Sequence, residues 1–102
     1  MKLLFNSRGK HIANLVGEQL YAPNGPNVGH YLPSQEIFID MRGHYLGEIV
    51  QGNRLMYNKM SQYHSINFVS YGNYGNAGNY GNSGNAGSIG IVYGYRDVEL
   101  NG

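Results

Sequence analysis

The sequence predicts an all-β protein built from repeated short β-hairpins, followed by a glycine- and asparagine-rich segment and a closing strand. One observation is a pattern of aliphatic and aromatic residues around a turn, which recurs three times before residue 60. Another is that no long window keeps apolar residues at the three- and four-residue spacing of a helix. The third is the run YGNYGNAGNYGNSGNAGS, in which glycine returns at every third position.

Composition limits the size of the fold and the class of partner. The chain has 102 residues, which is room for a single domain over residues 1–102. Charged residues make up 13% and the formal net charge is +1, so no strong field favours nucleic acid or a membrane surface. The absence of cysteine excludes disulfides and thiolate sites. The start MKLLFNSRG has too few apolar residues for a signal peptide, and we expect a cytoplasmic protein.

Residues 1–69 contain the hairpin units. The units begin at Leu4, Leu20 and Phe38, and their turns contain glycines that lie 16 and 18 residues apart. These structural turn glycines are Gly9, Gly25 and Gly43. Glycine suits such turns because it adopts positive φ without a steric cost. One hairpin is not stable alone in water, so the units must bury their apolar faces against each other.

A fourth unit is predicted to begin at Leu55. Met60 occupies the position where its turn glycine is expected, so this turn is altered or lost. Near the end of the chain, the β-branched and aromatic residues from Ser88 to Tyr95 predict a closing strand, and residues 89–102 are assigned to this strand and a tail.

Several segments together resemble the bacterial 4-fold beta flower domain proteins. They are LYAPNGPNVGHYL, IFIDMRGHYLGEIVQGNRL and the Gly-Asn repeat that closes in GSIG. The resemblance covers most of the chain and implies an all-β arrangement of hairpin petals about a central axis. It implies no activity and no catalytic residues. Met60 departs from the repeat, which leaves open whether the fourth petal comes from this chain or from a neighbour.

In a three-residue helix of the polyproline II kind, the Gly-Asn repeat, residues 70–88, would place glycine on one edge and asparagine on the next. Eighteen residues of such a helix would span roughly 55 Å, whereas a domain of this size has a radius of gyration of about 13 Å. The segment therefore cannot lie straight within one domain. It could double back into a layer of short strands, run along a neighbouring subunit as a strap, or form a flexible polar tract.

Catalytic motifs are missing from the sequence, which has no phosphate loop, GxGxxG, HExxH or GxSxG. We expect no enzyme activity, no cofactor and no metal. The histidines differ in their positions relative to the turn glycines, so symmetry would not gather them into one metal-binding ring. We interpret them as turn or strand-edge residues that form local hydrogen bonds. They are His11, His30, His44 and His64.

Asp40 and Glu48 have the spacing of a carboxylate pair that could act as acid and base. Asp40 and Glu48 flank the Gly43 turn and are expected to face each other across the third hairpin. Arg42 and Arg54 lie nearby in the sequence, so salt bridges explain the pair more simply than general acid–base chemistry.

The remaining candidate for function is a surface of tyrosines and asparagines in the repeat. Tyrosine rings are flat and amphipathic, and amides both donate and accept, so such a surface suits sugar rings or a partner's backbone. Packing of the hairpins by the same tyrosines is the alternative explanation. The candidate residues are Tyr71, Tyr74, Tyr80, Asn73, Asn76 and Asn79.

Two classes of function follow. The first is a non-catalytic assembly or protein-interaction module that forms a homo-oligomer, because closing a ring removes the exposed edges of short hairpins. The alternative is a protein that binds a small ligand or glycan through the tyrosine and asparagine surface.

Overall fold

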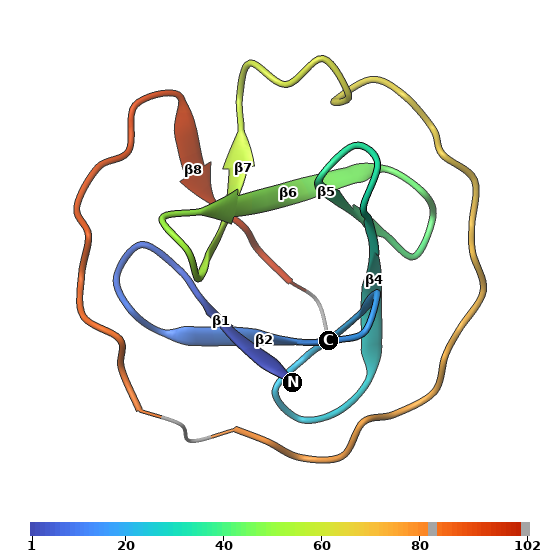
Figure 1. Cartoon of the computed structure of the whole chain (residues 1–102), viewed down its shortest axis with the longest axis horizontal. Coiled ribbons are helices and arrows are strands. Elements are labelled where there is room, and N and C mark those ends of the chain that lie inside the picture. The colour runs from blue at the N-terminus through green and yellow to red at the C-terminus, as the bar shows by residue number, and fades with distance from the viewer. Residues whose placement is uncertain (82–83, 101–102) are drawn as a thin grey trace.

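A computed structural model describes residues 1–81 and 84–100 of the chain. It confirms the all-β class, since these residues form strands, turns and irregular segments and no helix (Figure 1). The strands are β1 (Lys2–Phe5), β2 (His11–Val16), β3 (Gln19–Tyr21), β4 (Asn27–Leu32), β5 (Ile37–Asp40), β6 (Tyr45–Val50), β7 (Arg54–Asn58) and β8 (Tyr95–Asp97).

Strands β1 to β7 close into a ring. Each pairs antiparallel with the next along the chain, and β1 returns to pair parallel with β7 through Phe5 and Arg54. Strand β8 pairs antiparallel with the other end of β7, from Met56 to Asn58. The ring therefore closes within a single chain, and β7 bonds β1 near its start and β8 near its end.

Three turns of the ring have the same hydrogen bond. The backbone N–H of Gly9, Gly25 and Gly43 donates to the carbonyl oxygen three residues earlier, at 3.0, 2.9 and 3.1 Å. All three glycines have positive φ, of 88°, 122° and 90°. A non-glycine residue adopts this conformation only at a cost, so the sequence spacing of these glycines fixes where the chain reverses.

The turn after β7 is altered. Ser61 donates its N–H to the carbonyl of Asn58 at 3.1 Å, so Ser61, rather than Met60, is equivalent to the turn glycines. The strand that follows this turn in space is β8, which comes from the far end of the same chain. The prediction of a closing strand from Ser88 to Tyr95 is largely wrong in position. Strand β8 begins at Tyr95, and the residues before it are irregular.

The hydrophobic core repeats with the units. Leu4, Leu20, Phe38 and Leu55 come from β1, β3, β5 and β7, are fully buried, and belong to one cluster together with Val98. Burial of side chains of this size contributes about 1.5–3 kcal/mol each. A second cluster contains four buried residues, with Tyr57, Tyr63 and Phe68 against it. Its buried members are Leu32, Ile37, Ile39 and Tyr45.

The Gly-Asn repeat forms a belt, defined as residues 67–90, that runs around the outside of the ring and leads back to β8 (Figure 1). Asn82 and Ser83 of the repeat, and Asn101 and Gly102 of the tail, lie outside the described residues. The belt does not have a polyproline II backbone, because six of its glycines have φ of 74° to 89° rather than about −75°. These are Gly72, Gly75, Gly78, Gly84, Gly87 and Gly90. The chain can therefore bend at these six glycines and follow the ring.

Candidate functional site

The belt contacts the turns of the ring at nine-residue intervals. The N–H of Phe68 donates to the carbonyl of Gly43 at 2.8 Å, that of Ala77 to Gly25 at 2.9 Å, and that of Ala86 to Gly9 at 2.9 Å. Nine residues are three Gly-Asn-X triplets, so the repeat length matches the distance from one turn to the next. As the belt runs from Phe68 to Ala86, it meets the Gly43 turn first and the Gly9 turn last. The belt therefore runs around the ring in the direction opposite to that of strands β1 to β7.

The turn glycines leave room for the belt. A β-carbon added to Gly9 would lie 2.6 Å from the backbone nitrogen of Gly87, and one added to Gly43 would lie 2.5 Å from the carbonyl oxygen of Val69. At Gly25, an added β-carbon would overlap the side chain of Asn76. These glycines thus serve both positive φ and close approach of a second backbone.

Asparagine side chains hold the belt in its bent form. The side-chain oxygens of Asn73, Asn76 and Asn79 accept the backbone N–H two residues later, at 2.7, 2.7 and 3.0 Å. Asparagine favours such local turns because its short side chain imitates the backbone. The amide oxygens of all three predicted surface asparagines are therefore used within the belt.

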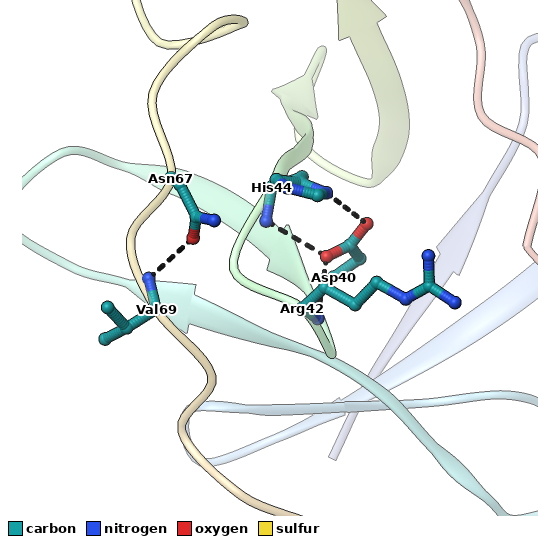
Figure 2. A network of polar contacts seen from close by, with 5 residues as sticks. All are labelled: Asp40, Arg42, His44, Asn67 and Val69. Atoms are coloured by element: carbon teal, nitrogen blue, oxygen red, sulfur yellow. Dashed lines mark hydrogen bonds and ion pairs between the residues drawn. The ribbon is translucent and has the colours of Figure 1, made fainter.

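Figure 2 shows the third turn of the ring and the belt segment beside it. Oδ1 of Asp40 accepts the N–H groups of Arg42 and His44 at 2.9 and 3.0 Å, and His44 Nδ1 lies 3.9 Å from Asp40 Oδ2. On the belt, Asn67 Oδ1 accepts the N–H of Val69 at 2.9 Å. The Asp40 carboxylate therefore accepts hydrogen bonds from the backbone of its own turn.

The predicted pairing of Asp40 with Glu48 is wrong. In the register of β5 and β6, Ile39 pairs with Tyr45 and Phe38 with Gly47, while Glu48 pairs with Met56 on the other side. The salt bridges expected with Arg42 and Arg54 are also not found among the residues that the structure describes.

Arg54 joins the ring to the belt, a role that its position in the sequence did not indicate. Its side chain is buried, and Nη1 donates to the carbonyls of Asn6 and Gly87 at 3.1 and 2.7 Å. Nη2 donates to the carbonyl of Ala86 at 3.3 Å. One guanidinium thus binds the first turn and the far end of the belt together.

The three candidate tyrosines are each about half exposed. Tyr71 stacks on the ring of His30 with centroids 5.6 Å apart, and Tyr74 meets the same ring edge-on at 5.7 Å. Tyr80 donates its backbone N–H to the carbonyl of Pro23 at 2.8 Å. The structure therefore gathers Tyr71 and Tyr74 over one histidine and sets Tyr80 at the neighbouring turn.

Two of the four histidines are buried, which their positions in the sequence did not indicate. His44 and His64 are exposed, whereas His11 and His30 are buried. His11 Nε2 is 2.6 Å from Asn14 Oδ1, and His30 Nδ1 lies against Gln19 Oε1. Burial lowers the pKa of His30, and the backbone of Gly72 opposes this in part. No group of metal-ligating side chains gathers among residues 1–81 and 84–100.

Glu48 is the centre of a polar cluster that sequence reasoning missed. Its carboxylate accepts from the hydroxyls of Tyr45 and Tyr95, both at 2.9 Å, and from the side-chain amide of Asn58 at 3.4 Å. Burial raises the pKa of both tyrosines, and the hydrogen bond and negative charge of Glu48 add to that effect. Tyr95 is 47 residues from Glu48, so no local pattern could reveal the pair.

An apolar patch projects where the belt ends. Ile91 is 95% exposed and Tyr93 is 97% exposed. Beside them is an open groove of about 320 Å³, lined in part by Met56, Val92 and Tyr95. We call Ile91, Val92 and Tyr93 the apolar patch.

Comparisons of the chain with protein-family models, with curated proteins and with solved structures give no match. Within the part of the chain that the structure describes, no helix is long and apolar enough to cross a membrane.

Proposed function

We propose that this protein is a non-catalytic module that self-associates through the apolar patch next to β8. The observation that carries the proposal is the near-complete exposure of Ile91 and Tyr93 on one loop. Large apolar side chains that stand together in water mark surfaces for association. The ring closes within one chain, so the second copy is needed to cover this patch and not to complete the ring.

The relative position of patch and groove favours a second copy as the occupant. The patch and the groove share Ile91 and Val92, so they lie on the same edge of the molecule. A two-fold axis at this edge would bring the Tyr93 ring of each copy to the groove of the other. Such a contact is self-complementary, as a closed dimer requires.

The size of the surface is compatible with a dimer. The chain exposes 5826 Å² in total, and a standard interface covers about 800 Å² on each partner, or roughly one seventh of that surface. A tyrosine buries about 150–250 Å², so Tyr93 supplies a substantial part of the core of such an interface.

The fold beneath the patch is proposed to be a four-petal arrangement about the ring axis, with petals β1–β2, β3–β4, β5–β6 and β7–β8. The repeated turn hydrogen bonds and the four equivalent core residues support this arrangement. The proposal that it is not an enzyme is supported by Asp40 and Glu48, whose carboxylates are both engaged by neighbouring donors.

Sedimentation equilibrium of three proteins tests self-association. The wild type is expected to form dimers at high micromolar concentration, and the double variant Ile91→Ser, Tyr93→Ser is expected to be monomeric. The matched control is Met60→Ser, which removes another exposed apolar side chain, 84% exposed, at the turn after β7. A monomeric wild type, or a double variant that still dimerises as the control does, would overturn the proposal.

A further inference from the structure

We propose that the cavity between the β4–β5 loop and the turn after β7 binds a neutral saccharide. The cavity is open to solvent and has a volume of about 360 Å³, which lies in the range of small-molecule sites. The residues that line it and carry the argument are Gln35, Glu36, Glu48, Asn58, Gln62 and Tyr63. This binding site is additional to the self-association proposed above.

Glu48 supplies a fixed acceptor in this cavity. Three donors, from Tyr45, Tyr95 and Asn58, hold its two oxygens. A carboxylate offers about four acceptor positions, so about one is left for a ligand hydroxyl. The side chain is already immobilised by its neighbours, and a ligand would therefore bind without the usual loss of rotamer entropy.

The other polar groups of the cavity match hydroxyl groups. Gln35 and Gln62 carry amides that donate as well as accept, as a sugar hydroxyl does. The Asn58 amide is already engaged, because it donates to Glu48 and accepts the N–H of Met60 at 2.9 Å. The lining contains no lysine, arginine or histidine, so a phosphate or carboxylate ligand would find no counter-charge. The chemistry therefore favours a neutral polyhydroxyl compound over an anion.

An apolar surface for the carbon–hydrogen face of a sugar is also present. Tyr63 lines the cavity, and its ring is held against Phe68 with centroids 5.8 Å apart. Ile37 also lines the cavity, and its side chain is fully buried. A flat amphipathic ring beside fixed polar groups satisfies both kinds of surface that a sugar ring presents.

Glu36 gives a variant that removes a cavity carboxylate without harming the fold. Its φ is 57°, in the left-handed region that favours glycine, and its N–H donates to the carbonyl of Leu32 at 2.8 Å. Glu36→Gly removes the carboxylate, and glycine adopts this left-handed conformation without the steric cost that it has for glutamate. Gln51→Gly is the matched control, because Gln51 also has a left-handed φ, of 51°, and is absent from the cavity lining.

Saturation-transfer NMR with glucose, galactose, mannose and N-acetylglucosamine, each added alone, tests the site. At least one sugar is expected to receive magnetisation from the wild type, with affinity about tenfold lower for Glu36→Gly and for Glu48→Gln, as for loss of one hydrogen bond to a charged group. Gln51→Gly is expected to bind as the wild type does. Thermal unfolding of the two glycine variants at or above the wild-type temperature shows that the fold is kept.

Three results would overturn the inference. One is that none of the four sugars receives magnetisation from the folded wild type. Another is that a sugar binds equally well to Glu36→Gly, Glu48→Gln and Gln51→Gly, which would place it elsewhere. The third is that butylammonium binds at the cavity while the sugars do not, since the two carboxylates would then serve a cation.

Discussion

The guanidinium of Arg54 donates a hydrogen bond of 2.7 Å to the carbonyl oxygen of Gly87, and this contact links the closure of the ring to the closure of the belt. Arg54 also pairs with Phe5 where β7 meets β1. The two ends of the ring and the last third of the belt therefore meet at one buried side chain.

Replacing Arg54 with methionine is expected to destabilise the protein by about 2–4 kcal/mol, because the carbonyls of Asn6, Ala86 and Gly87 lose a charged donor. Methionine keeps most of the apolar length of the side chain, so lost packing is a minor contribution. Urea unfolding followed by circular dichroism measures the change. A loss below about 0.5 kcal/mol, the range of ordinary surface substitutions, would show that the belt does not depend on Arg54.

The close approach at the turns gives a second prediction, which compares two glycines. Gly43 and Gly52 have φ of 90° and 88°, but an alanine β-carbon would meet Val69 only at Gly43 and has open space at Gly52. Gly52→Ala is expected to cost about 1 kcal/mol from backbone strain. Gly43→Ala is expected to cost about 1–3 kcal/mol more and to make the belt susceptible to proteolysis, because Val69 must move. Equal losses for the two variants in urea unfolding would contradict the close contact.

The Glu48 cluster predicts loss of stability at alkaline pH. The pKa values of Tyr45 and Tyr95 are raised above the ordinary value of about 10 by burial and by Glu48. Because the pKa values are higher in the folded state, the contribution of the two tyrosines to the free energy of unfolding is intact below pH 10. This contribution declines as the pH rises through the pKa values of the folded state. Titration of tyrosinate absorbance should show three hydroxyls that ionise late, because burial and the charge of Glu36 also raise the pKa of Tyr31. Glu48→Gln should make only those of Tyr45 and Tyr95 ionise earlier. Unchanged titration of the variant would remove Glu48 as a cause.

His30 predicts a loss of stability on the acid side. Burial lowers its pKa below the usual value of about 6.5, and the surrounding Gln19, Tyr71 and Tyr74 offer no negative charge. The contribution of neutral His30 to the free energy of unfolding is therefore complete above pH 6.5 and declines as the pH falls towards the pKa of the folded state. His30→Phe keeps an aromatic ring between the tyrosines and should flatten the dependence of unfolding free energy on pH between 7 and 5. His64→Phe, at an exposed position where the ring meets the carbonyl of Ser61 rather than a carboxylate, should retain the wild-type slope.

The all-β class and the three turns at Gly9, Gly25 and Gly43 could be predicted, because glycine adopts their positive φ most readily and apolar residues mark the strands around them. The path of the belt could not be predicted, since a three-residue period is shared by polyproline II and by glycines at φ near +85°. The Ser61 turn lacks the glycine that identifies the others. The contacts of Glu48 with Tyr95 and of Arg54 with Gly87 join residues far apart in sequence, where no periodic pattern extends.

Hydrogen exchange of the belt amides, followed by NMR on the native wild type, most directly tests the claim that the belt is bonded to the turns at nine-residue intervals. The amides of Phe68, Ala77 and Ala86, which donate to turn carbonyls, are expected to exchange much more slowly than those of Gly75 and Gly78, which donate to exposed asparagine side chains. Uniformly fast exchange along all five amides would contradict the claim, because it would mean that the repeat does not remain bonded to the ring.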